Sequence, residues 1–494
     1  MDWIQIGKYV TMFFYVINLI LVIYASISMV FRKSDPVRTV TWIIILITLP
    51  YIGLILYIVF GQNFRKTKIY NRKGVKDLKI RKEISSQQAY LYQSNIDNMP
   101  PELRSYRKLI IQNINSNNSI LAMNHSVDVY FYGKDALDSM LESIEKATNH
   151  IHLQSYIIAD DIIGNKFKNL LIRKAKEGVL TRVIYDDVGC WSLPKKFIKD
   201  MTDAGIEVLC FSPVKIISPT SKINYRNHRK ILVVDGLEGF IGGVNIADRY
   251  YTGGSFAEWR DTHIKIKGES IFSLQASFLL DRYFIKNIHI RRRKRYYPEI
   301  TAVKTILDPE EVPTYAQVIS SGPDSDWSSI MQVYFTAMTE AKKSIKIITP
   351  YFTPSETILN TIKIAALSGV DVKIMLPEKS DSIVTQYSTY SYISELLQAG
   401  VKVYLFKEGF NHSKVISIDN QFCIIGSANM DNRSFEYNFE ITSILYDHRI
   451  SEQIEDQFNK DIEGCILINK TEWKQRPRYV RFLESLARLF SPLL

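Results

Sequence analysis

The sequence predicts an α/β protein built from two repeated halves and preceded by a pair of membrane-spanning helices. Three observations lead to this fold class. Two long uncharged runs lie near the N-terminus. Strand-like and helical runs alternate from about Ser116 onward, and segments of the first half recur about 190 residues later, as in a duplicated domain. The expected boundaries are 1–64 for the membrane hairpin, 65–115 for a basic juxtamembrane linker, 116–297 for the first half, 298–320 for a linker and 321–494 for the second half.

The two uncharged runs are Tyr9–Phe31 and Thr39–Phe64, and each is long enough to cross a bilayer. A cleaved signal peptide is the alternative for the first run, but its apolar core is too long and a second run follows at once. Pro50 and Gly53 lie inside the second run. They would break a water-soluble helix, whereas membrane helices tolerate them, so we expect two spans.

Lysine and arginine are distributed unevenly around these runs. Three lie in the connecting segment and nine lie between Arg65 and Lys82, so the positive-inside rule puts the rest of the chain and the N-terminus in the cytoplasm. The basic stretch is either a solvated linker or a contact with anionic lipid headgroups. The net charge of +11 fits an anionic partner. The run at 291–295 reads as a solvated surface segment, and we expect no nucleic-acid partner.

Three pairs of segments show the internal repeat directly. Ile151–Asp161 matches Ile345–Ser355, Lys176–Asp187 matches Leu367–Glu378, and Asp203–Phe211 matches Gln398–Phe406. The first half also carries an insertion, because Gly205 lies 23 residues before His228 whereas Gly400 lies 12 before His412. The inserted PVKIISPTSKINYR is either a flexible loop or a basic surface for a lipid headgroup.

The C-terminal residues 476–494 predict a basic amphipathic helix, with Phe482, Leu486, Leu489 and Phe490 on one side and arginines on the other. This helix either packs on the rest of the protein or lies on the membrane. The four cysteines lie far apart without a CxxC pair. They are expected to be reduced and buried, with neither a disulfide frame nor a zinc site.

One motif occurs twice and ends each half. NHRKILVVD at 227–235 returns as NHSKVISID at 411–419. In both copies a histidine is followed by Lys at +2, Asp at +7, Gly at +14 and Asn at +17. The segment reads as a strand, so the histidine and lysine side chains project to the same face. A single histidine on a strand is more often a packed residue than a catalyst, but a doubled and extended pattern favours catalysis.

A neutral imidazole beside an ammonium and an amide suits a phosphodiester. The lysine and asparagine bind the non-bridging oxygens, while the histidine attacks phosphorus or moves a proton. The candidate catalytic residues are His228, Lys230, Asp235, His412, Lys414 and Asp419. Asn245 and Asn429 are the candidate phosphate-binding residues.

These residues resemble the phospholipase D superfamily, whose signature is a pair of HxKxxxxD motifs, each followed by a Gly-containing turn and an Asn. The resemblance covers about residues 120–465, and GGVN at 242–245 and GSAN at 426–429 fall where the family has its second motif segment. It implies two α/β/α sandwich halves with pseudo-two-fold symmetry that share one active site. One histidine would become a phosphohistidine and the other would serve as general acid and base, without a metal or other cofactor.

The resemblance also implies supporting residues. Asp261 and Glu440 match the carboxylates that hold the second ring nitrogen of each histidine, and we expect Asp261 to support His228 of its own half. The motif aspartates are expected to hold the backbone and the lysines. Asn438 is expected only to cap a turn, outside the site. Related enzymes generally use the N-terminal histidine, which implies that His228 is the nucleophile and that His412 starts protonated.

The second apolar run also resembles the membrane hairpin that precedes many bacterial cardiolipin synthases, in its pattern of Trp42, Pro50, Tyr51, Gly53, Tyr57 and Gly61. The implied function is phosphatidyl transfer from one phosphatidylglycerol to another, giving cardiolipin and glycerol in a bacterial cell membrane. Anionic membrane lipids are the expected partners. A phospholipase D hydrolase, a membrane-tethered nuclease and a catalytically silent scaffold are the alternatives. The oligomeric state stays open.

Overall fold

The structure is a computed structural model that describes residues 3–31, 36–57, 76–214, 224–288, 293–298 and 312–493. The chain folds as two compact units, one of residues 1–70 with 214–224, and one of residues 71–213 with 225–494. Most of the predicted insertion at 213–226 lies outside the described residues, as do 58–64 of the second uncharged run, 65–75 of the basic stretch, 299–311 of the linker and two residues of the run at 291–295.

The N-terminal unit contains one helix with the length and composition of a membrane span. This helix, α1 (Trp3–Phe31), includes an apolar stretch from Thr11 to Ser28. The described part of the second uncharged run, up to Tyr57, contains α2 (Pro36–Thr48) and α3 (Pro50–Leu56). Among the described residues, the expectation of two long spanning helices is therefore confirmed for the first run only.

The break between α2 and α3 has a local cause. Leu49 leaves the helical conformation, with φ −127° and ψ 66°, and Pro50 occupies the first position of α3, where its missing N–H costs nothing. The chain then turns back, so that the Trp42 and Tyr57 rings lie 5.6 Å apart. A Cβ on Gly53 would lie 2.6 Å from the Ile45 carbonyl oxygen, so this close return needs glycine.

The second unit is built on one continuous mixed sheet. The first half of the chain contributes β1 (Leu121–Tyr132), β2 (His150–Ser155), β3 (Leu180–Asp186), β4 (Glu207–Phe211), β5 (Ile231–Val234), β6 (Glu238–Gly242) and β7 (Trp259–Gly268). The second half contributes β8 (Thr314–Ser321), β9 (Ser344–Ile348), β11 (Asp371–Pro377), β12 (Lys402–Phe406), β13 (Phe410–Asn411), β14 (Val415–Ile418), β15 (Phe422–Gly426), β17 (Glu440–Tyr446) and β18 (Cys465–Leu467). A separate small sheet pairs β10 (Phe352–Thr353) with β16 (Met430–Asp431).

The strand order shows the duplication. From the centre outward, β1-β7-β6-β5-β2-β3-β4 in one half answers β8-β17-β15-β14-β9-β11-β12 in the other, and β18 extends the second edge. β1 and β8 pair antiparallel, with Leu121 opposite Gln317, so the two halves share a single sheet. The predicted linker at 298–320 therefore ends too late, because β8 already begins at Thr314.

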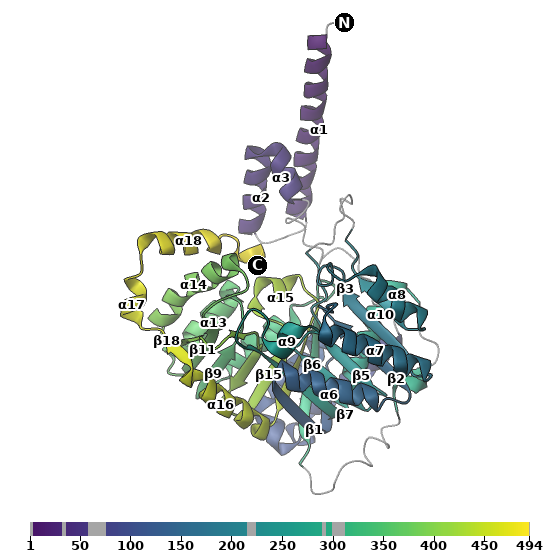
Figure 1. The fold of residues 1–494 in the computed structure, drawn as a ribbon. Helices are drawn as coiled ribbons and strands as arrows, with labels where there is room; N and C mark the ends of the chain where they lie inside the picture. Colours follow the sequence, from purple (N-terminus) through teal and green to yellow (C-terminus); the bar gives the residue numbers. More distant parts are fainter. Residues whose placement is uncertain are drawn as a thin grey trace. The chain divides into compact units, whose positions relative to one another are not determined.

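Helices cover both faces of this sheet (Figure 1). One face carries α6 (Gly133–Glu145), α7 (Ile162–Lys176) and α8 (Lys195–Asp203) in the first half, and α12 (Ser329–Thr339), α13 (Glu356–Leu367) and α14 (Ile383–Gln398) in the second. The other face carries α10 (Ser270–Lys286) and α16 (His448–Glu463), which share one apolar core across both halves. The short helices are α9 (Asp248–Thr252), α15 (Asn432–Glu436), α17 (Lys470–Lys474) and α18 (Arg478–Arg488), with 3₁₀ turns η3 (Ile96–Asn98), η4 (Pro101–Tyr106), η5 (Arg293–Tyr296) and η6 (Ser491–Leu493).

The segment predicted as a juxtamembrane linker is partly a structural element of this unit. It contains α4 (Lys76–Ser94) and α5 (Arg107–Asn117). Leu109, Ile110 and Ile114 of α5 are buried in the core with α12, and the Asn113 amide donates to Gln317 of β8 over 3.0 Å. The apolar residues of α5 recur at helical spacing and bury one face, which a reading based on charge overlooked.

Candidate active site

Each motif histidine is held by the opposite half of the protein. The His228 backbone N–H donates to the Phe439 carbonyl oxygen over 2.9 Å, and the His412 N–H donates to that of Arg260 over 2.6 Å. These contacts continue short parallel pairings, of Asn227 with Phe439 and of β13 with the start of β7. The first residues of each motif are thereby held by the opposite half, while the motif strands β5 and β14 stay in the sheet of their own half. Both histidine side chains are buried.

These contacts between the halves also decide which carboxylate supports which histidine. Nδ1 of His228 lies 3.1 Å from the Glu440 carboxylate, and Nδ1 of His412 lies 2.7 Å from that of Asp261. Asp261 follows Arg260 and Glu440 follows Phe439, so each carboxylate comes directly after the residue that binds the opposite motif. The expected pairing of Asp261 with His228 is therefore wrong, although both carboxylates do lie at the site.

The glycine at +14 of each motif permits this close approach. A Cβ on Gly242 would lie 2.5 Å from the Thr262 carbonyl oxygen, and a Cβ on Gly426 would lie 2.6 Å from that of Ile441. Thr262 and Ile441 each follow the supporting carboxylate in sequence. A side chain at either glycine would push the carboxylate strand away from the histidine it supports.

The two motif lysines are buried beside their own histidines. Nζ of Lys230 donates to the His228 carbonyl oxygen over 2.7 Å. Nζ of Lys414 lies 2.8 Å from Nδ1 of His412 and also donates to its carbonyl oxygen. Burial lowers the pKa of Lys230 to about 7 and that of Lys414 to about 8. An anion bound between them would restore both charges.

Burial also lowers the pKa of both histidines. The pKa of His228 falls to about 4, and that of His412 falls well below its usual range because the two lysines add to the effect of burial. The expectation that His412 starts as an imidazolium is therefore wrong for the protein without a bound substrate. The negative charge of a bound phosphodiester is needed to hold a proton on this ring.

The two histidine–carboxylate pairs differ in how firmly the ring proton is placed. Nδ1 of His228 faces two acceptors, the Glu440 carboxylate and the Ser427 carbonyl oxygen 3.0 Å away. Burial raises the pKa of Glu440, but His228, Lys230 and Ser427 outweigh it and hold that pKa below its usual value. Nδ1 of His228 therefore carries the proton and Nε2 has a free lone pair.

Nδ1 of His412, by contrast, lies between a donor and an acceptor. Lys414 and the Asp261 carboxylate compete for it, and burial raises the pKa of Asp261 to about 7. The Asp261 carboxyl can therefore hold a proton near neutral pH, and a bound phosphodiester would favour its transfer to His412. This suits a group that takes up and releases a proton during a reaction.

The predicted phosphate-binding asparagines are engaged within the protein. Asn245 accepts from the Ile157 backbone N–H over 3.1 Å and donates to the Tyr250 hydroxyl over 2.6 Å. The Asn429 side chain hydrogen-bonds the Asp431 carboxylate. Both therefore brace the loops around the histidines, and direct contact with phosphate stays a prediction.

The motif aspartates lie at the far end of their strands from the histidines. Asp235 accepts from the backbone N–H groups of Asn149 and His150, each over 2.8 Å, and Asp419 accepts from those of Lys343 and Ser344, over 2.6 and 2.8 Å. Both adopt a positive φ, of 56° and 55°. The expected backbone role is confirmed, whereas the expected contact with Lys230 is absent, since that lysine donates to His228.

The structure also places residues that the sequence reading passed over. Arg249 and Arg433 each follow their histidine by 21 residues, so the repeat itself contained the signal. Arg249 lies 5.1 Å from the Trp259 ring and helps to lower the pKa of His412. Arg433 acts electrostatically on Tyr156, whose ring packs edge-on against His228 at 5.0 Å.

Asn438, expected only to cap a turn, also belongs to the support of the site. Its amide donates to one Glu440 oxygen over 3.1 Å, while the Ser427 hydroxyl donates to the other. Both carboxylate oxygens thus accept hydrogen bonds from fixed donors in addition to His228. Within the described part of the chain, no group of three His, Cys, Asp or Glu side chains is arranged to hold a metal ion.

Fold and site together define a two-histidine phosphodiester-transfer enzyme of the phospholipase D class. A family model described as "Cardiolipin synthase, PLD-like domain" matches residues 140–275 and 334–462. A second model, "Phospholipase_D-nuclease N-terminal", matches residues 20–62. The chain belongs to the cardiolipin synthase family of the phospholipase D superfamily.

Curated relatives extend over nearly the whole chain. It is 38% identical to a cardiolipin synthase of Alkalihalophilus pseudofirmus over 475 residues, covering 96% of this chain and 92% of the relative. It is 36% identical to the major cardiolipin synthase ClsA of Bacillus subtilis over 490 residues, covering 97% and 98%. Among solved structures, the phosphatidylserine synthase of Haemophilus influenzae shares the fold, with a TM-score of 0.59, 17% identity, and coverage of 78% of this chain and 100% of that one.

Replacing either motif lysine by alanine is expected to lower turnover on the order of a hundredfold or more, because each Nζ is predicted to stabilise charge on a transferring phosphoryl group. The fold should persist, because the Glu440 and Asp261 carboxylates each keep a hydrogen-bonded histidine when a lysine is removed. Steady-state rates and melting temperatures of Lys230→Ala and Lys414→Ala measure this, with the exposed Lys196→Ala as the control. Near-normal turnover in either variant would remove that lysine from the site.

Proposed function

We propose that this chain transfers a phosphatidyl group from one phosphatidylglycerol to the headgroup hydroxyl of a second, forming cardiolipin and releasing glycerol. The observation that carries the proposal is the pair of buried histidines, each held by a carboxylate of the opposite half and accompanied by a buried lysine. Such a site can break one phosphorus–oxygen bond and then form another, with one histidine bonded to phosphorus in between and the other donating and accepting the proton.

The proposed reaction has two steps. Nε2 of His228 attacks phosphorus, the bond from phosphorus to the glycerol oxygen breaks, and His412 gives a proton to that oxygen. A second phosphatidylglycerol then enters, His412 takes the proton of its hydroxyl, and the new phosphorus–oxygen bond displaces His228. One bond to phosphorus forms and one breaks in each step, so no oxidant, reductant or metal is required.

The proton positions support this division of roles. The Glu440 carboxylate keeps the proton on Nδ1 of His228 and stabilises the positive charge that the ring gains when Nε2 bonds to phosphorus. The exchangeable proton between His412, Asp261 and Lys414 supplies the general acid. Lys230 and Lys414 bind the non-bridging oxygens of the phosphodiester. Asn245 and Asn429 are predicted to bind them as well, once their amides leave Tyr250 and Asp431.

Transfer and hydrolysis are separated by giving the purified full-length protein phosphatidylglycerol alone. Cardiolipin with an equal amount of glycerol supports the proposal, whereas phosphatidic acid as the main product supports a phospholipase D hydrolase. Cleavage of a single-stranded oligonucleotide without lipid turnover would support the nuclease alternative.

Activity is expected to survive exhaustive chelation in detergent micelles, because the histidines and lysines supply the charge that a metal would otherwise supply.

We further propose that the chain crosses a bacterial cell membrane twice. Its second unit, residues 71–213 with 225–494, is the catalytic unit and is proposed to be cytoplasmic. The lengths of the two uncharged runs and the nine basic residues between Arg65 and Lys82 support this topology. The return of α3 along α2 is the geometry of a re-entrant segment, which would leave a single crossing.

Protease protection distinguishes these topologies. Added to intact spheroplasts, protease is expected to leave both the catalytic unit and an N-terminal tag intact, and in inverted vesicles it is expected to digest both. Digestion of the tag alone in spheroplasts would mean a single crossing by α1. Digestion of the catalytic unit in spheroplasts would reverse the proposed orientation.

A further inference from the structure

The C-terminal helix α18 is attached to the second unit through its polar side. Arg488 donates to Glu395 of α14 over 2.6 Å, and its guanidinium lies 4.2 Å from the Tyr392 ring. The Ser491 and Ser388 hydroxyls lie 2.8 Å apart. Figure 1 shows α18 running over α14 at the edge of the unit. These contacts fix the orientation of the helix.

The apolar side of α18 faces away from the protein. Phe482 is 67% exposed, Leu486 45%, Leu489 73% and Phe490 49%, and Tyr479 is also exposed. These residues recur at the three- and four-residue spacing of one helix face. Within the helix only Glu484 and Ala487 are buried, so folding leaves the predicted apolar side uncovered within the described part of the chain.

A groove of about 510 Å³ lies between α14 and α18, next to this apolar side. Its two carboxylates already have partners: Glu395 binds Arg488 and Lys363, and Glu484 binds Arg476 through both oxygens. Arg478 and Arg481 also line the groove, and neither has a carboxylate within ion-pair distance among the described residues. The groove therefore has two uncompensated positive charges.

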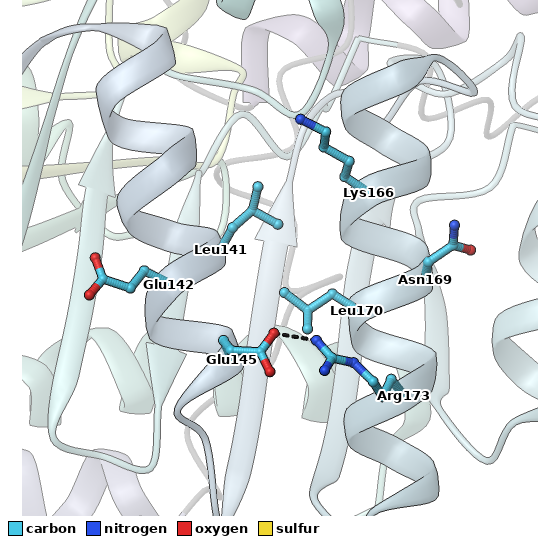
Figure 2. A pocket seen from close by; sticks show the side chains of 7 residues that line it. All are labelled: Leu141, Glu142, Glu145, Lys166, Asn169, Leu170 and Arg173. Atoms are coloured by element: carbon cyan, nitrogen blue, oxygen red, sulfur yellow. Dashed lines mark hydrogen bonds and ion pairs between the residues drawn. The ribbon is translucent and has the colours of Figure 1, made fainter.

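A second groove shows that this excess is not a general property of the surface. This groove has a volume of about 680 Å³ and lies between α6 and α7. Figure 2 shows the side chains that line it. There Glu145 pairs with Arg173, and Glu142 pairs with Lys146 over 2.6 Å. Lys166 is the remaining cation among its lining residues, and no row of exposed aromatic and leucine side chains adjoins it in the described part of the chain.

We propose that α18 is a membrane-docking helix, with its apolar side in the bilayer and the phosphodiester of an anionic phospholipid in the groove at Arg478 and Arg481. Charge complementarity selects the occupant: two unpaired arginines beside an apolar row fit an anionic bilayer surface. A groove for a partner protein would not need this combination of free cations and large exposed side chains.

The position of α18 connects this docking to the active site. The turn η6, which follows α18, packs against α15, which contains Arg433. The loop before α12 reaches the same helix, because the Ser328 hydroxyl donates to Glu436 over 2.6 Å, and its neighbour Trp327 is 55% exposed. Docking of α18 therefore brings the α15 side of the catalytic unit to the bilayer surface.

The test uses the full chain in nanodiscs with a polarity-sensitive dye on a cysteine introduced as Leu489→Cys. Burial raises the pKa of the partly exposed Cys210 and Cys465 to about 12, and the chain without the added cysteine measures their background labelling. In discs containing phosphatidylglycerol, the dye at 489 is expected to shift to the blue and to be quenched by brominated acyl chains. A dye at Asn169→Cys, in the α6–α7 groove, is expected to show neither effect.

The arginines are tested with Arg478→Gln/Arg481→Gln. This pair is expected to lower the ratio of docked to undocked helix about 30-fold, whereas the exposed pair Lys195→Gln/Lys196→Gln leaves it unchanged. Absence of quenching in the unsubstituted helix overturns the proposal. Equal quenching in purely zwitterionic discs, unaffected by the arginine changes, overturns the headgroup site, and a shielded dye without quenching assigns the surface to a protein partner instead.

Discussion

Glu440→Gln is expected to slow formation of the phosphatidyl–enzyme adduct on the order of a hundredfold or more, although Glu440 lies in the opposite half from His228. Both oxygens of Glu440 accept hydrogen bonds from fixed donors, Asn438 on one side and Ser427 on the other. A glutamine would turn its NH₂ group against one of these donors. It would also remove the charge that stabilises His228 when its ring becomes cationic.

Asp261→Asn is expected to act on a different step. Its partner is His412, so this variant should form the adduct at close to the normal rate from a donor with an acidic leaving group and then discharge it slowly to phosphatidylglycerol. Single-turnover measurements of adduct formation and decay separate the two variants, with the exposed Glu452→Gln as the control. Slow formation in Asp261→Asn and normal formation in Glu440→Gln would restore the pairing within each half.

This exchange of partners marks the limit of what the sequence reveals about the site. The motifs identify both histidines and both lysines by local spacing, and the resemblance to the superfamily adds the two carboxylates, Asp261 and Glu440. The pairing depends on contacts between Asn227 and Phe439 and between Asn411 and Arg260, which join distant parts of the chain. Since the two halves are symmetric, exchanging the partners leaves the set of residues unchanged, so the motif pattern alone cannot distinguish the two arrangements.

Distance along a strand explains why the motif aspartates, Asp235 and Asp419, lie away from the histidines with which the sequence pattern groups them. Lys230 and Asp235 are separated by five residues, which span about 16 Å in an extended strand. Both ends of the motif therefore cannot touch one phosphate. The aspartate instead accepts backbone N–H groups where the chain enters β2, and Asp419 does the same before β9.

The fold was predictable in its repeat and less so in its boundaries. The repeated segments predicted the equivalent strands from β2 to β5 and from β9 to β14, because these strands match in sequence. β8 was assigned to a linker because nothing in its own sequence shows that it pairs with β1 at the centre of the sheet. The turn at Pro50 was overlooked for a related reason, since membrane helices also tolerate proline.

The nucleophile is expected to be His228, and the two histidine variants should differ in kind. Both His228→Ala and His412→Ala are expected to lower turnover on the order of 10⁴-fold or more, because residues that act as a unit fail together. They differ with a donor whose leaving group is acidic and needs no general acid. His412→Ala should then still accumulate a phosphatidyl adduct, since Nε2 of His228 keeps its lone pair and Glu440 keeps the proton on Nδ1. His228→Ala should accumulate none, and the exposed His448→Ala should behave as the parent.

Rapid denaturation, followed by mass spectrometry of acid-labile phosphopeptides, locates the adduct. Phosphate on His412 would reverse the two roles, and stable turnover without any phosphohistidine would exclude the covalent route.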